Sequence, residues 1–497
     1  MSSTSSSEHS RILGGYARKL SHAAKPNNIS IHINNHYHSR VYTTGSEVSG
    51  QVTITPQTDT RFDTLQIVLL GTSKTRTDAV NIPQTTSHTF LKLIMPIPES
   101  SYPIPRRLEA GLKYTLPFTF VIPSTLTLNA CSHQVANDSV QEHHTRLPPT
   151  IGSWEKDDFA PHMSRVQYVI KARVYVDDAT DGSSTKIMEA GEEIKVLPTV
   201  PEDAPLSVTK HDDLYVMSKS KTLRKTIISP KTGKVTITAA QPSASMLSPD
   251  GQTITSTTVP LHLEFEPISI DARPPKITGI SSKVTAVTYF SAGGINHYPN
   301  LKDWHRSFGS DGRGSYSSTI SVTTGHFGQV KWSRHLTAQA RRDSGYGSDS
   351  LSSSDTDLPP RPASKKTKGN LPSPIFHSAQ LQVPIQLPVQ KRTFVPTFHS
   401  CITSRVYVLW LTVTVVSGGN SAHLTLGVPL QIGVNGTDSH PDNAALPPSF
   451  EETEQADVDE YLRPRVMSIP TIDFHHNGAL PGYADIHYNR RRTVAAH

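Results

Sequence analysis

Residues 166–176 have the sequence VQYVIKARVYV, and this stretch decides the fold class. Every second residue from the first to the last is apolar, while Gln167, Lys171 and Arg173 lie among the positions between them. Because successive side chains of a β-strand point to opposite faces, this period of two predicts a strand with one face on a hydrophobic core. An amphipathic helix would instead repeat its apolar residues every three or four positions.

The same alternation recurs in short runs along most of the chain. Gly, Pro, Asn, Asp and Ser separate the runs, as turns require, and helical spacing is almost absent. Many short strands divided by turns predict an all-β protein of the sandwich or barrel type. The runs lie at 29–33, 48–54, 65–69, 116–122, 166–176, 235–237, 259–265, 284–290, 381–389, 402–416 and 424–432.

Length and composition indicate several domains. The chain has 497 residues, of which 35% are apolar and 38 are proline, so we expect folded cores diluted by disordered segments. The expected order is a disordered N-terminus at 1–26, a β-sandwich at 27–197, a second at 198–433, and a disordered Pro-rich and acidic tail at 434–497. A long disordered insertion at 292–370 would interrupt the second domain. A β-sandwich tolerates such an insertion, because the entropy cost of closing a loop grows only slowly with loop length. The alternative is three domains with a linker at 292–370.

Cysteine and histidine usage predicts no metal centre. The two cysteines, Cys131 and Cys401, are too few for a disulfide framework, and both lie in or beside apolar runs. We therefore expect reduced thiols in the core. The histidines include adjacent pairs such as His143 and His144, but no set of four ligands is evident in the sequence. Surface histidines, no metal and no cofactor are the expectation.

Charge and hydropathy point to a protein of the cytosol or the nucleus. The N-terminal segment lacks the apolar region of a secretory signal, and no apolar run reaches the roughly 18 residues of a membrane span. The formal net charge is +6, and the acidic segment EETEQADVDE at 451–460 leaves the remainder more basic. This balance is compatible with peripheral contact with an anionic membrane or with phosphorylated partners, and ordinary solubility is the alternative.

Four short motifs follow one another in the first β domain. They are VYTTGSEVSGQV at 41–52, FDTLQIVLLG at 62–71, YTLPFTFVIP at 114–123 and LPPTIG at 147–152. In the first motif, Gly45 suits a turn that needs a positive φ, and Gly50 suits a strand crossed closely by its neighbour.

These motifs, in this order, resemble those of the arrestin-like N-terminal domain. Residues 396–432, which end in GVPLQI, look like the end of an arrestin C-terminal domain. With its long insertion and Pro-rich tail, the chain is most similar to fungal α-arrestins. The resemblance implies two immunoglobulin-like antiparallel β-sandwiches, the arrestin fold.

The resemblance also implies a role. Fungal α-arrestins are cytoplasmic adaptors, not enzymes, that are recruited to the plasma membrane or endosomes. They link the cytosolic parts of membrane transporters or receptors to a HECT-type ubiquitin ligase with WW domains, for ubiquitin-dependent endocytosis. The alternative is an arrestin-fold signalling or vesicle-coat scaffold without ligase recruitment.

The family's ligase-binding motif is Pro-Pro-x-Tyr, and this chain carries a degenerate form of it. The segment LPPSFEE at 446–452 contains Pro447, Pro448 and Phe450. Consecutive prolines favour the polyproline II conformation that docks on aromatic grooves. Phe450 keeps the aromatic ring but lacks the hydroxyl, which costs roughly 1 kcal/mol for one hydrogen bond. A solvated linker is the alternative interpretation.

The segment RRDSGYGSDS at 341–350 has the pattern of a regulatory site. Arginines precede Ser344, as basophilic kinases require, and phosphates on Ser344 and Ser348 would add charge near the lysines at 365–368. The same letters resemble a phosphodegron, although Ser/Gly-rich segments produce such strings by chance.

No catalytic or nucleic-acid-binding motif accompanies these features. The sequence has no complete P-loop, nucleophile elbow, His-Glu-x-x-His helix or kinase signature. Its basic residues show no RNA-binding or zinc-finger pattern, so no nucleic-acid partner is expected.

Overall fold

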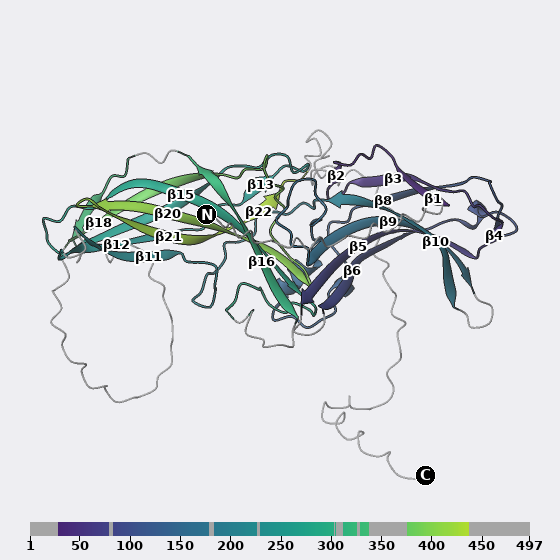
Figure 1. Cartoon of the computed structure of the whole chain (residues 1–497), viewed down its shortest axis with the longest axis horizontal. Helices are drawn as coiled ribbons and strands as arrows, with labels where there is room; N and C mark the ends of the chain where they lie inside the picture. The colour runs from purple at the N-terminus through teal and green to yellow at the C-terminus, as the bar shows by residue number, and fades with distance from the viewer. Residues whose placement is uncertain are drawn as a thin grey trace, which may run out of the picture. The chain divides into compact units, whose positions relative to one another are not determined.

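The chain forms a predominantly β structure, as the alternating runs predict (Figure 1). We call residues 28–197 the N-terminal half and residues 198–436 the C-terminal half. The two halves belong to one compact unit. The computed structural model describes residues 28–78, 83–177, 183–225, 229–302, 304, 312–325, 329–336 and 375–436.

The N-terminal half places one hydrophobic core among its sheets. Strands β1, β3 and β8 form one sheet, and β2, β10, β9, β5 and β6 form another in that order. All pairs are antiparallel except the short β2–β10 pair. The elements are β1 (Ile29–Ile33), β2 (Val41–Tyr42), β3 (Glu47–Ile54), β4 (Thr60–Arg61), β5 (Thr64–Asp78), β6 (Pro83–Met95), the 3-10 turn η1 (Glu99–Ser101), β7 (Arg107–Leu108), β8 (Tyr114–Val121), the 3-10 turn η2 (Leu128–Ala130), α1 (Asp138–Thr145), β9 (Ser164–Asp177) and β10 (Ser184–Val196).

Strand β9 confirms the period of two. Its alternate residues from Val166 to Val174 are buried in this core, because β9 pairs with β5 on one edge and β10 on the other. The two glycines of the first motif also behave as predicted. Gly45 has a φ of 79°, and a Cβ on Gly50 would lie 2.1 Å from the carbonyl oxygen of His32. A side chain at Gly50 would therefore separate β3 from β1.

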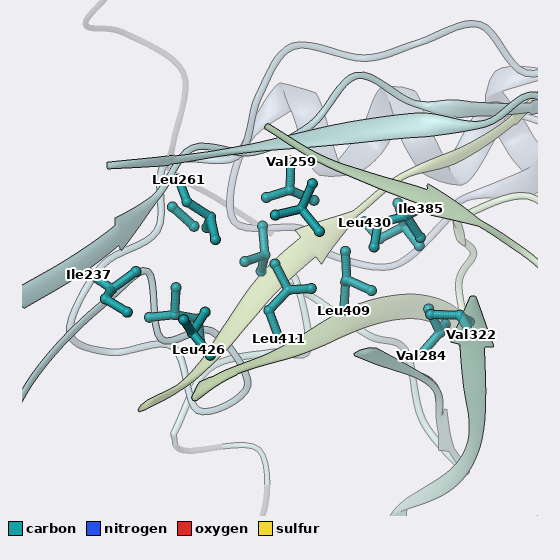
Figure 2. Close-up of a cluster of buried hydrophobic side chains, with 14 of the residues drawn as sticks. Ile237, Val259, Leu261, Val284, Val322, Ile385, Leu409, Leu411, Leu426 and Leu430 are labelled. Atoms are coloured by element: carbon teal, nitrogen blue, oxygen red, sulfur yellow. The ribbon is translucent and has the colours of Figure 1, made fainter. Parts of the chain in front are cut away.

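The C-terminal half has its own core between two sheet layers. Strands β11, β12, β14 and β18 form one layer, β15, β20, β21 and β19 form the other, and β16 pairs with both β15 and β18. Figure 2 shows aliphatic side chains of both layers meeting in this core. The strands are β11 (Ser218–Arg224), β12 (Lys231–Ala239), β13 (Ser245–Leu247), β14 (Thr257–Pro267), β15 (Lys276–Ser291), β16 (Arg313–Thr324), β17 (Ser333–Leu336), β18 (Ile375–Gln386), β19 (Phe398–His399), β20 (Thr403–Ser417), β21 (Asn420–Leu430) and β22 (Ile432–Val434).

The expected disordered insertion at 292–370 is too wide. Strands β16 and β17 lie inside it, and β16 pairs with β15 over ten residues through its backbone. Serine and threonine dominate β16, and Val322 is its buried residue, so the strand lacks the apolar alternation that marks the others. The expected tail also begins too early, since Val434 is buried in β22. Residues 1–26, 337–370 and 437–497 lie outside the described residues.

Candidate functional site at the junction of the two halves

The two halves exchange apolar anchors. Phe159 belongs to the N-terminal half but packs in the core of the C-terminal half, where its ring centroid lies 5.2 Å from that of Phe394. In return, Val395 and Phe398 of the C-terminal half pack in the core of the N-terminal half. Each core is therefore completed by the other half.

The anchor Phe159 lies in a backbone conformation that needs support. Its φ is 60°, a left-handed value that costs a residue with a side chain on the order of 1–3 kcal/mol. The Phe159 N–H donates to Asp157 Oδ1 at 2.7 Å, which supports the turn. This backbone turns the aromatic ring out of its own half and into the neighbouring core.

Buried hydroxyl groups join the strands of the two halves. The Thr403 hydroxyl, at the start of β20, lies 3.2 Å from that of Ser73 on β5 and 3.0 Å from that of Ser164 on β9. The Thr75 hydroxyl donates to the carbonyl oxygen of Ser291 at 2.7 Å. These four side chains are buried, so their hydrogen bonds replace water that the junction excludes.

A buried guanidinium group adds a charge to the junction. Arg405 on β20 is 0% exposed; its Nε donates to Thr288 Oγ1 at 2.8 Å, and its Nη1 donates to the carbonyl oxygen of Asp158 at 2.8 Å. The Asp158 carboxylate accepts from the backbone N–H groups of Gly152 and Ala160 instead. Among the described residues, no carboxylate forms an ion pair with Arg405. The cation is therefore held by neutral oxygens from both halves.

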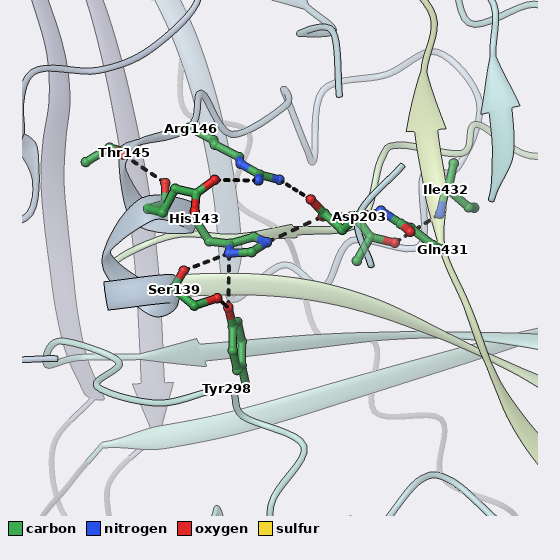
Figure 3. A network of polar contacts seen from close by, with 10 residues as sticks. Ser139, His143, Thr145, Arg146, Asp203, Tyr298, Gln431 and Ile432 are labelled. Carbon is green, nitrogen blue, oxygen red and sulfur yellow. Dashed lines mark hydrogen bonds and ion pairs between the residues drawn. The ribbon is translucent and has the colours of Figure 1, made fainter. Parts of the chain in front are cut away.

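Asp203 is the centre of a second polar contact, between helix α1 and the C-terminal half (Figure 3). Its carboxylate accepts from Arg146 Nη1 at 2.8 Å, from Gln431 Nε2 at 3.2 Å and lies 3.4 Å from His143 Nε2. His143 in turn contacts the hydroxyl of Tyr298 at 3.0 Å. Residues 143 and 146 come from the N-terminal half, whereas 298 and 431 come from the C-terminal half, so Asp203 ties the two together.

Helix α1 holds these groups in place through its N-cap. The side chain of Asn137 accepts from the Val140 N–H at 3.0 Å, which satisfies one of the open donors of the first turn. The apolar Val140 and the ring of His144 are buried on the inner face, while His143 lies beside Tyr298.

The environment of Asp203 favours its charged form. The hydrogen bond with His143 is the largest cause, Arg146 adds to it, burial opposes both, and the net effect lowers the pKa of Asp203 to about 2. By its distance of 2.8 Å, the Arg146 pair is the tighter contact. A lowered pKa in the folded state means that the carboxylate stabilises the fold above its ordinary pKa of about 4.

We expect a pH-dependent loss of stability in the variant Asp203→Asn. The wild type should be about 1 kcal/mol more stable above pH ~5, because solvent screens a pair whose carboxylate is 33% exposed. This advantage should shrink as the pH falls below about 4 and disappear as it passes through the folded pKa of about 2. Urea titrations of both proteins between pH 2 and 7 measure the difference in unfolding free energy. A difference that does not change over this range would contradict the assignment.

Two cysteines and two histidines meet beside this network. The ligand atoms of Cys131, His133, His144 and Cys401 all lie within 4.8 Å of one another. Cys131 follows η2, His133 lies in the loop before α1, His144 lies in the last turn of α1, and Cys401 lies between β19 and β20. Three of the four come from the N-terminal half and one from the C-terminal half.

The expectation of surface histidines is wrong for this cluster, whereas the expectation of reduced cysteines in the core is confirmed. His144 is 1% exposed, so it is not a surface histidine, and the structure assembles a four-ligand set that the sequence did not suggest. Both cysteines are buried free thiols, as predicted. Burial lowers the pKa of His144 to about 4 and raises the pKa of the Cys401 thiol. The only sequence signal is the short Cys131-x-His133 spacing, because Cys401 is 270 residues away from Cys131.

The other predicted site residues lie outside the described residues. These are Ser344 and Ser348 in the regulatory segment, and Pro447, Pro448 and Phe450 in the Pro-rich segment. No helix in the described ranges combines the length and the apolar composition that a membrane crossing needs. A comparison with protein-family models finds no match for the chain, and a comparison with curated proteins finds none either.

Proposed function

We propose that the chain is an arrestin-like adaptor, with two immunoglobulin-like β-sandwiches that bind membrane cargo and a tail that recruits a ubiquitin ligase. The observation that carries the proposal is the placement of the four ordered motifs. They supply the β2–β3 turn, strand β5, strand β8 and the segment before β9, and they contribute to one core. A second β unit with its own core follows, as the resemblance implies.

Contacts across the junction support a scaffold that presents fixed binding surfaces. The titratable clusters described above lie at this junction, where they contact both halves. An adaptor needs such a rigid scaffold, because its partners dock on strands and loops whose relative positions are fixed. The basic balance outside 451–460 supports peripheral contact with an anionic membrane beside the cargo.

The ligase link is tested at the degenerate Pro-rich motif. Under this proposal the variant Phe450→Tyr should bind a WW domain about fivefold more tightly than the wild type, since the regained hydroxyl contributes roughly 1 kcal/mol. Pro448→Ala is the matched control in the same segment and should weaken binding, because it removes part of the polyproline ligand. Titration calorimetry with the full chain and a ligase WW domain measures both constants.

One residue, Phe450, favours a second function, that of a signalling or vesicle-coat scaffold without ligase recruitment. Phe450 stands where the family's ligase-binding motif has tyrosine, and a scaffold that binds no ligase does not need that tyrosine. In that case the wild type and Pro448→Ala would bind WW domains equally poorly, and deletion of 446–452 would leave cargo internalisation unchanged. Either result would remove ubiquitin-ligase recruitment from the proposal.

A further inference from the structure

The Cys/His cluster brings the ligand atoms of two cysteines and two histidines close together in a largely buried place. Cys131 Sγ lies 3.5 Å from His144 Nδ1 and 3.8 Å from His133 Nδ1. The Cys131 sulfur can donate its one proton to one of these nitrogens and can accept only weakly from the other ring. Cys401 Sγ lies 3.5 Å from the carbonyl oxygen of Ala130 and also contacts the Cys131 thiol. His144 Nε2 has no hydrogen-bond partner within the described residues, although the ring is buried.

Two of the distances in the cluster match those between the ligands of a tetrahedral metal ion. With Zn–S bonds of ~2.3 Å and Zn–N bonds of ~2.05 Å, a tetrahedron places sulfur and nitrogen ligands ~3.6 Å apart. The two measured Sγ to Nδ1 distances, 3.5 Å and 3.8 Å, fall on either side of this value. Two thiolates and two imidazoles form the Cys₂His₂ set that zinc prefers in closed structural sites.

The surroundings of His133 orient it as a metal ligand. Its Nε2 lies 3.0 Å from the carbonyl oxygen of Ile295 and donates its proton there, which leaves Nδ1 bare and facing Cys131. A metal-bound histidine usually makes this kind of outer hydrogen bond. Gly294 leaves the room that this ring needs, because a Cβ there would lie 2.6 Å from the ring carbons of His133.

We propose that Cys131, His133, His144 and Cys401 bind a structural zinc ion that links the two halves of the chain. Both thiols lose their protons to solvent when the metal binds, and the four ligands leave no open coordination position. The N-terminal half supplies three ligands. The C-terminal half supplies the fourth, Cys401, and also the Ile295 carbonyl oxygen that accepts the hydrogen bond from His133. The ion therefore joins helix α1 and η2 to the loops that precede β20 and follow β15.

Metal content of the wild-type full chain is the first test, because it needs no variant that might fail to fold. We expect one zinc ion per chain by mass spectrometry after purification without chelators and dialysis against a weak chelator. X-ray absorption should give two sulfur neighbours at ~2.3 Å and two nitrogen neighbours at ~2.0 Å. Cobalt substitution should produce a thiolate charge-transfer band and the intense visible bands of tetrahedral Co²⁺. Less than stoichiometric zinc, or a first shell without sulfur, would overturn the proposal.

Variants then locate the ion. Cys401→Ser should lose the metal, whereas His423→Gln, an exposed histidine on β21 of the same half, should retain it. Gly294→Val keeps all four ligands but displaces His133, so it should bind zinc roughly 10- to 100-fold more weakly. Equal zinc content in all three variants would contradict the assignment. Thiol labelling of the unfolded chain is a further check. If both cysteines react only after reduction, they form a Cys131–Cys401 disulfide, and the metal site is refuted.

Discussion

Replacing Phe159 by alanine is expected to lower the free energy of unfolding by about 3–5 kcal/mol, the usual cost of removing a buried phenylalanine ring. The ring is 1% exposed and is surrounded by the core of the C-terminal half. Because it is carried by the N-terminal half, its loss also removes an anchor between the halves. We therefore expect the C-terminal half to unfold earlier than the N-terminal half in this variant. Hydrogen exchange measured at increasing urea concentration follows each half separately.

Phe90→Ala is the matched control for this prediction. Phe90 is also buried, but it packs in the core of its own half. Because this truncation leaves the anchor in place, it should lower the stability of both halves together and keep a single urea midpoint. If Phe159→Ala also keeps a single midpoint for the two halves, Phe159 is an ordinary core residue and the anchor interpretation is wrong.

Reversing the charge of Arg405 is expected to cost at least ~3 kcal/mol, since Arg405→Glu places an uncompensated carboxylate in a site that excludes water. The new carboxylate would face the oxygen atoms of Thr288 and Asp158, which now accept hydrogen bonds from the guanidinium. Expression, thermal midpoint and urea titration of the full chain measure the loss.

Arg405→Met separates the charge from the volume of the side chain. Methionine fills a similar space without burying a charge, so the loss of two hydrogen bonds should be largely offset by the removed desolvation cost. We expect Arg405→Met to stay within about 2 kcal/mol of the wild type. An Arg405→Met variant as unstable as Arg405→Glu would show that the hydrogen bonds, not the burial of the charge, decide the stability of this site.

The strands were largely predictable because their burial follows a local rule. The residues from Val166 to Val174 alternate between core and surface within one stretch of sequence. Gly45 lies where the backbone has a positive φ, and Gly50 lies where a neighbouring strand passes too close for a side chain. Strand β16 was missed for the same reason. Its serines and threonines are mostly exposed, and its position depends on backbone pairing with β15, which leaves no hydrophobic period in the sequence.

The junction could not be predicted, because its residues meet only after both halves have folded. Phe159 follows two aspartates and looks like a loop residue, yet its positive φ turns it into a distant core. Arg405 looks like a polar residue at the start of a strand. Nothing in the sequence around Cys401 indicates that it meets His133 and His144. Contacts between residues so far apart in the chain produce no regular spacing that a single sequence could reveal.

We expect the exchanged anchors, the buried hydroxyl groups and Arg405 to make the two β units one cooperative folding unit. Hydrogen exchange of the wild-type full chain across a urea series measures this, with β9 reporting on the N-terminal half and β20 on the C-terminal half. The two strands should lose protection at the same urea midpoint. Two well-separated midpoints would show that the halves fold independently and would contradict this expectation.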